Sequence, residues 1–232
     1  MYTLRSVLYP LYLSIPVQIL RTLGLDYNCL VMNSMFFMNA LIIALGDYYL
    51  YLLSKKFAGR QAAMISLVYM LFNYRMNYIF LKTLTNGVEA VFCMMGFYYY
   101  TSIKAKFDKN MALMTFAITL SFLVRSSSLI GWIPLVMIQI FRSWDWFIAV
   151  LQAGLFVTLP MCFVSVLVDS IFYGHLACPQ YQFVYINVIE DITRFFGEEE
   201  PFFFLMYLEH YTVAWTTMHY FMVSYFSYFM IK

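Results

Sequence analysis

Three polar side chains recur at helical spacing in the segment "FLKTLTNGVEAVF", residues 80–92. Lys82, Asn86 and Glu89 are separated by four and three residues, so a helix would carry a cation, an amide and a carboxylate on one stripe. The surrounding sequence is apolar, and polar or charged side chains in such a segment are costly unless they are paired or hydrogen-bonded. Two interpretations stay open: the three side chains line a binding site, or they satisfy one another between helices.

Three further charges lie inside or at the ends of apolar runs. Asp47 is in the middle of "IIALGDYYLYLL", Arg125 precedes "SSSLIGWIPL", and Asp169 follows a long apolar stretch. Arg125 or Asp169 alone could be an ordinary helix-end charge that reaches the interface. Together with Lys82 and Glu89, these charges from different helix ends at one membrane face predict a wet cavity or a bound ligand. Asp47 lies deep in a span without an obvious partner in the sequence, so it should be paired or functional.

The composition indicates an integral membrane protein. Hydrophobic residues make up 63% of the 232 residues and charged residues 11%, whereas a soluble domain has roughly a quarter of its residues charged. A net charge of +2 gives no reason to expect a nucleic-acid partner. The four cysteines lack the spacing of metal ligands, so no metal site is predicted.

Apolar runs predict an all-α, polytopic membrane bundle of about six or seven spans. They cover residues 29–54, 62–80, 84–101, 111–124, 127–141, 146–168 and 203–231. Residues 4–23 contain Pro10 and Pro16 and read as an interfacial or re-entrant helix rather than a signal peptide. A loop is predicted over 169–202.

Three loops with basic residues alternate along the chain: 54–60, 102–109 and 141–146. If they are cytoplasmic, the positive-inside rule is satisfied. Lys82, Glu89, Arg125 and Asp169 then fall at or near the opposite face. This topology needs residues 111–141 to cross the membrane twice, and one long helix broken at "RSSS" is the alternative.

Five segments resemble, in the same order, motifs of the glycosyltransferase family 22 mannosyltransferases. "KTLTNGVEAVF" resembles an Arg-Thr-x-Ser/Thr-Asn-x-x-Glu motif, and "LRSVLYPLYLSIP" an Arg-Ser-Tyr-x-x-Pro helix. The other three are "ALGDYYLYLLSKKFAG", "SFLVRSSSLIGWIPL" and "DSIFYGHLACPQYQFVYINVIEDITRFFG". The branch that builds glycosylphosphatidylinositol (GPI) precursors looks most similar, and the branch acting on dolichol-linked oligosaccharides is the main rival.

The resemblance implies a GT-C fold, one membrane domain over residues 1–232, and a site on the luminal face of the endoplasmic reticulum. Dolichol-phosphate-mannose would be the donor, a GPI precursor or other lipid-linked glycan the acceptor, and no cofactor is expected. The residues expected to bind substrate are Arg5, Asp47, Lys82, Asn86, Glu89, Arg125 and Asp169. A guanidinium matches phosphate oxygens, so Arg125 is expected at the donor phosphate, with Lys82 as a second cation.

The chain also departs from the family pattern. The family carries its catalytic carboxylate in a luminal loop before the Arg-Ser-Tyr helix, and this chain begins at that helix, so no catalytic residue is identified and the isolated chain is expected to be inactive. A family Arg is Lys82 here, and Arg-Pro-Thr is "RSS" at 125–127. Two alternatives follow: a non-catalytic membrane subunit of an unidentified complex, or a small transporter that uses Asp47 and Glu89 as coupling sites.

Overall fold

A computed structural model describes residues 5–73, 77–78, 81–82, 84–190 and 192. Every regular element within these residues is helical, as the composition predicted. The chain divides into two units, Met1–Val184 and Tyr185–Lys232. The first unit contains α1 to α9, and the described part of the second contains the short turn Tyr185–Ile189. The single domain over 1–232 stays a prediction, because most of the second unit lies outside the described residues.

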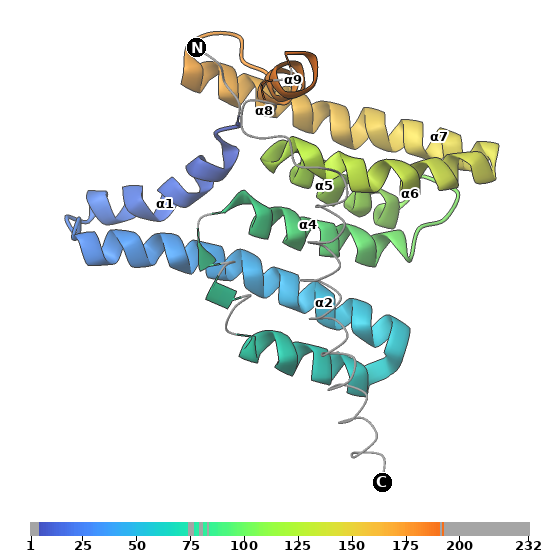
Figure 1. The fold of residues 1–232 in the computed structure, drawn as a ribbon, viewed down its shortest axis with the longest axis horizontal. Coiled ribbons are helices and arrows are strands. Elements are labelled where there is room, and N and C mark those ends of the chain that lie inside the picture. The colour runs from blue at the N-terminus through green and yellow to red at the C-terminus, as the bar shows by residue number, and fades with distance from the viewer. Residues whose placement is uncertain (1–4, 74–76, 79–80, 83, 191, 193–232) are drawn as a thin grey trace. The chain divides into compact units, whose positions relative to one another are not determined.

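Helix α1 spans Leu8–Thr22 and continues through both prolines. Pro10 lies in the first turn, where a backbone N–H has no helical partner to lose, and Pro16 is an interior proline that bends helices. The helix is bent part-way along (Figure 1). A helix is thus present within the predicted 4–23, beginning at Leu8, and its interfacial placement stays a prediction. Its 15 residues fall short of the about 20 that cross a bilayer.

Helix α2 spans Asn28–Phe72 and contains a sharp reversal at Gly59. The backbone there has φ 84° and ψ 179°, a region open essentially to glycine alone. The chain turns back on itself at this point (Figure 1). The predicted break over 54–60 is therefore confirmed as a tight turn between two helical halves.

Helices α4 (Thr85–Tyr100) and α5 (Lys109–Val124) form an antiparallel pair. Asp108 caps the start of α5 by accepting a 2.9 Å hydrogen bond from the backbone N–H of Met111. The first half of α2 runs parallel to α4. Gly46 allows this approach, because a Cβ there would lie 2.7 Å from Cγ2 of Val91.

The chain breaks at Arg125 and folds back. A 3₁₀ turn, Ser126–Ser128, leads into α6, Leu129–Arg142. Trp132 of α6 packs over Gly96 of α4, and Tyr100 donates a 3.4 Å hydrogen bond to the carbonyl of Leu135. These contacts make α6 parallel to α4 and antiparallel to α5. Residues 111–141 are therefore two antiparallel helices, and the single broken helix is ruled out.

The last long helical stretch combines α7 (Trp144–Ala153), the π-helical turn Gly154–Thr158 and α8 (Leu159–Tyr173). Gly174 ends it with a left-handed φ of 71°, and the short helix α9 follows at Pro179–Val184. The loop predicted to begin at residue 169 was wrong at its start. Helical hydrogen bonding continues through Tyr173, four residues further.

Two helices of the described part are long and apolar enough to cross a membrane, Asn28–Phe72 and Trp144–Tyr173. The apolar helices Lys109–Val124 and Ser126–Arg142 are shorter. The predicted run 203–231 lies outside the described residues. The described part of the chain is thus an all-helical bundle with two candidate membrane-spanning helices.

The bundle has two chemically different ends. The turns at residues 54–60, 102–109 and 141–146 all lie at the right-hand end of Figure 1. We call it the basic end, and its cations are Lys55, Lys56, Arg60, Lys104, Lys106, Lys109 and Arg142. The start of α4, the α5–α6 turn and the end of α8 lie at the other end, which we call the Arg125 end.

Candidate functional site

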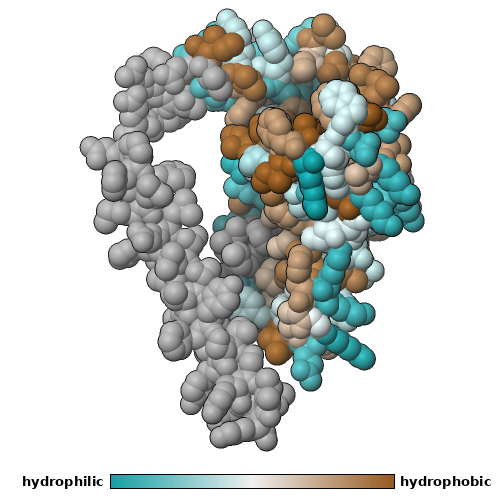
Figure 2. Space-filling view, turned by 90° about the vertical axis from the view of Figure 1, so that its right-hand side faces the viewer, coloured by the Kyte–Doolittle hydropathy of each residue, from teal (hydrophilic) through white to brown (hydrophobic). Residues whose placement is uncertain are grey.

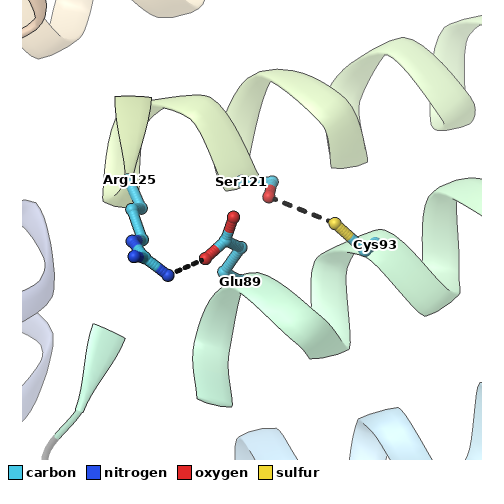
Figure 3. A network of polar contacts seen from close by, with 4 residues as sticks. All are labelled: Glu89, Cys93, Ser121 and Arg125. Atoms are coloured by element: carbon cyan, nitrogen blue, oxygen red, sulfur yellow. Dashed lines mark hydrogen bonds and ion pairs between the residues drawn. The ribbon is translucent and has the colours of Figure 1, made fainter. Parts of the chain in front are cut away.

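An ion pair joins α4 to α5 at the Arg125 end. The Nη1 atom of Arg125 lies 2.9 Å from Oε2 of Glu89, and the two side chains point toward one another across the helix pair (Figure 3). Arg125 stands where α5 ends, with extended backbone angles of φ −149° and ψ 111°. The helix break thus places its guanidinium beside the first turns of α4.

A second polar contact fixes the register of this pair. Cys93 and Ser121 lie one helical turn from Glu89 and Arg125, with 3.6 Å between Sγ and Oγ. Ser121 is completely buried. Because both contacts obey one antiparallel register, the ion pair is set by the packing of two helices rather than by a flexible loop.

The guanidinium keeps capacity for another anion. The side chain of Arg125 is 42% exposed, and that of Glu89 is 18% exposed. A guanidinium has five N–H donors in a planar fork, and the contact with Glu89 uses Nη1. The side chain can therefore hold a second oxygen ligand, such as a phosphate oxygen, while Glu89 keeps it in place.

Lys82 is near this end but not on the predicted stripe. Helix α4 begins at Thr85, so Lys82 lies in the turn before it, and the single helical stripe was wrong for this residue. Its Nζ lies 4.5 Å from the centroid of the Tyr78 ring, a cation–π contact. Asn86 is exposed in the first turn of α4. The described contacts do not join Lys82, Asn86 and Glu89 to one another.

A buried amide that the sequence interpretation did not single out supports the same region. Asn39 of α2 is 2% exposed, and its Oδ1 accepts a 2.8 Å hydrogen bond from the hydroxyl of Tyr9. Its Nδ2 donates to the carbonyl of Leu81 at 3.2 Å. Asn39 therefore links α1 and α2 to the turn that carries Lys82. The sequence feature that could have identified Asn39 was an amide within the apolar run "FFMNALII".

Asp169 has a structural role. It is fully buried, and its Oδ1 accepts hydrogen bonds from Ser6 Oγ at 3.0 Å and from the backbone N–H of Val7 at 2.8 Å. Its Oδ2 is 3.4 Å from Ser165 Oγ. The carboxylate therefore satisfies a backbone N–H and a hydroxyl at the start of α1.

Arg5 and Asp47 are the remaining predicted residues. Arg5 is exposed, and its backbone carbonyl accepts a 3.1 Å hydrogen bond from the hydroxyl of Tyr173. Asp47 is half-buried on α2, and the described part of the chain gives it neither a hydrogen bond nor an ion pair. No set of three metal-ligating side chains occurs among the residues the structure describes.

The structure thus brings some of the predicted residues together and separates others. Glu89 and Arg125 are in contact, and Lys82 and Asn86 share their end of the bundle. Asp169 bonds to the chain just before α1, at Ser6 and Val7, and the Arg5 carbonyl there is bonded to Tyr173 instead. The resulting chemistry is a half-exposed guanidinium, oriented by one carboxylate and with an ammonium group at the same end, which suits an anionic group such as a phosphate.

Comparison with known proteins identifies a family of mannosyltransferases. The sequence model of the Alg9-like mannosyltransferase family matches residues 1–230. GPI alpha-1,2-mannosyltransferase 3 of Bos taurus is 30% identical over 197 residues, and that of Homo sapiens is 30% identical over 198. GPI mannosyltransferase 3 of Candida albicans is 27% identical over 205 residues.

The aligned regions cover most of this chain but a minor part of each relative. They include 84% of this chain and 36% of the Bos taurus protein, 84% and 35% for Homo sapiens, and 87% and 41% for Candida albicans. The chain therefore spans about a third of the length of the curated relatives it matches. No solved structure matches the chain significantly.

Proposed function

The chain belongs to the Alg9-like mannosyltransferase family, and from that premise we propose that it takes part in mannosyl transfer during assembly of GPI anchors. The relatives named as GPI mannosyltransferases support this branch over the oligosaccharide branch. The observation that carries the proposal is the half-exposed Arg125, held by Glu89 at the end of the bundle away from the basic loops.

The donor we propose is dolichol-phosphate-mannose. In the transfer, an acceptor hydroxyl oxygen bonds to the anomeric carbon of mannose, and the bond from that carbon to the phosphate oxygen breaks. Dolichyl phosphate leaves with the electron pair and gains charge, which Arg125 and Lys82 stabilise. Asn86 binds sugar hydroxyls. A carboxylate must take the proton of the acceptor hydroxyl, and we assign none of the described residues to that role.

We place the chain in the endoplasmic reticulum membrane as a multi-pass protein of six or seven spans. The basic end faces the cytoplasm, and the Arg125 end faces the lumen. The common location of three basic turns supports this orientation, because cytoplasmic loops carry an excess of Lys and Arg. The lipid-linked acceptor, a GPI precursor, then meets the donor at the luminal face.

A binding experiment tests the donor site without requiring turnover. The 232-residue chain is reconstituted and irradiated with a photoreactive dolichyl phosphate, beside photoreactive dolichol as the phosphate-free control. We expect labelling of the wild-type chain and about a 10- to 100-fold weaker affinity in Arg125→Gln, because a hydrogen bond to a charged group is lost. Arg125→Lys should retain part of the affinity, and Arg21→Gln on α1 should retain all of it. Equal labelling by both probes, or by Arg125→Gln, would refute the donor site.

A non-catalytic membrane subunit is the second candidate, and a specific observation favours it. Asp169 accepts hydrogen bonds from three donors, and Glu89 is paired with Arg125. Both acids are therefore engaged by other groups of the chain. Radiolabelled mannose incorporation into GPI precursors, in membranes from cells that lack GPI mannosyltransferase 3, separates the candidates. Incorporation that requires this chain supports transfer, whereas its absence, together with co-purification of a partner protein, supports the subunit.

A further inference from the structure

Lys56 joins two of the three turns of the basic end. Its Nζ donates to the carbonyl and the hydroxyl oxygen of Thr101, both at 2.8 Å, and to the hydroxyl of Ser102 at 2.6 Å. This ammonium neutralises the carbonyl end of α4, where a cation is favourable. It also fixes the turn at 54–60 against the loop at 101–109.

The other cations of the basic end have no acidic partner within the described part of the chain. They are exposed, and they comprise Lys55, Arg60, Lys104, Lys106, Lys109 and Arg142. Two acids are close in sequence, and one of them, Asp108, is occupied as the cap of α5. Figure 2 looks onto this end and shows hydrophilic side chains projecting from it. The surface therefore carries a large excess of uncompensated positive charge.

Exposed aromatic side chains lie beside these cations. Phe57 is 71% exposed, Phe141 79% and Trp144 71%. Each is within three residues of a basic residue at the end of a helix. Aromatic rings gather at the level of lipid headgroups, where one side is apolar and the other is wet. This combination fits a membrane interface better than it fits bulk water.

We propose that the basic end is a binding surface for the headgroups of anionic phospholipids. Charge complementarity selects this occupant, because unpaired ammonium and guanidinium groups at a helix-bundle end attract acidic headgroups near the same plane. Lys56 keeps the surface in one arrangement, and the aromatic rings set its depth at the interface. The surface lies at the opposite end from Glu89 and Arg125, so the proposal does not depend on mannosyl transfer.

The test compares lipids around the full chain in nanodiscs, with spin-labelled phosphatidylserine or phosphatidylcholine as the probe. We expect the motionally restricted fraction to show about a three- to tenfold preference for phosphatidylserine near 0.1 M salt, falling toward one at 1 M. The variant Arg60→Gln/Lys104→Gln/Lys106→Gln should reduce the preference to within about twofold of unity.

Two matched variants make the result specific. Arg21→Gln removes one cation from α1, away from the basic end, and should leave the preference unchanged. Arg60→Lys/Lys104→Arg/Lys106→Arg keeps every charge and should retain it, which separates lost charge from misfolding. Equal association of both lipids with the wild-type chain overturns the proposal, as does an undiminished preference in the triple Gln variant. Failure here leaves the labelling by dolichyl phosphate unaffected.

Discussion

Asp169 is a buried carboxylate that accepts hydrogen bonds from Ser6, Val7 and Ser165. Replacing Asp169 by Ala leaves the hydroxyl of Ser6 and the N–H of Val7 unsatisfied in the interior. We expect a loss of about 2–4 kcal/mol in the free energy of unfolding. Unfolding in mixed micelles, followed by tryptophan fluorescence, measures the change.

The matched control is Asp26→Ala, because Asp26 is an exposed carboxylate in the turn between α1 and α2. It should change the unfolding free energy by no more than about 0.5 kcal/mol. Equal effects of the two substitutions would show that the carboxylate of Asp169 does not anchor α1.

The Glu89–Arg125 pair contributes less to stability than its short distance suggests. Arg125 is 42% exposed, and exposed pairs are screened. A double-mutant cycle of Glu89→Gln, Arg125→Gln and the double variant should give a coupling free energy of about 0.5–1 kcal/mol. A coupling of several kcal/mol would mean that the pair is a structural clasp, and it would weaken the assignment of Arg125 to a ligand.

Sequence reasoning at this scale singled out Glu89 and Arg125 but did not predict that they are in contact. It grouped Glu89 with Lys82 and Asn86 because residues three and four apart are neighbours on a helix. The actual partner, Arg125, is 36 residues away. That contact depends on the antiparallel register of α4 and α5, which single-helix periodicity does not contain. Asn39 was missed for the same reason.

At the scale of elements, the packing of α4 on α6 depends on Gly96. A Cβ there would lie 2.8 Å from Cζ2 and 2.9 Å from Cη2 of Trp132. The indole is buried in the core and cannot move aside freely. Gly96→Ala should therefore lower the unfolding free energy by about 1–3 kcal/mol. Gly131→Ala is the control, because a Cβ at Gly131 has open space. Chemical denaturation of the two variants measures their unfolding free energies, and equal values would contradict this prediction.

The reversal in α2 gives a prediction of a different kind. Gly59 has open space around a Cβ, but its φ of 84° is one that other residues rarely adopt. Gly59→Ala should cost about 1–3 kcal/mol through backbone strain alone. Gly154→Ala, in open space with a helical φ of −58°, should be neutral or stabilising. The same denaturation assay measures both, and a neutral Gly59→Ala would argue against the tight reversal.

The predicted element boundaries were correct where the local residue types determine them. The break at "RSSS" and the turn at 54–60 were predicted and are observed, since polar and glycine residues interrupt apolar runs there. Lys82 was predicted within a helix that begins only at Thr85, and Asp169 was predicted at a helix end that lies further on, at Tyr173. Helix ends depend on capping partners elsewhere in the chain, such as those at the start of α1, and an apolar pattern does not specify them.

At the scale of the whole molecule, the positions of the turns predict a topology. Single cysteines at Arg60 and Lys106, in a chain whose native cysteines are replaced by serine, should react with an impermeant maleimide from the cytoplasmic side of sealed microsomes. A cysteine at His175 should react only after permeabilisation, because that residue follows α8 at the Arg125 end. Labelling of all three from one side would refute the proposed orientation.

Composition was sufficient to predict a helical membrane bundle, because 63% hydrophobic residues leave few other folds. Composition was a poorer guide to the number of crossings. Several apolar runs form helices of only 14–16 residues, which are short for a span unless neighbouring turns complete them. Hydropathy and helix length therefore do not fix the number of crossings.

The anchor of α1 also fixes an order of events during synthesis. Val7 and the carboxylate it binds are 162 residues apart in the chain. At about 5–20 residues per second, Asp169 is made roughly 8–30 s after Val7. Helix α1 is therefore synthesised well before α8, and the contacts at the start of α1 form only after α8 has been made. During that interval the N–H of Val7 and the hydroxyl of Ser6 have no Asp169 carboxylate to donate to, so formation of the start of α1 depends on a segment that is made much later.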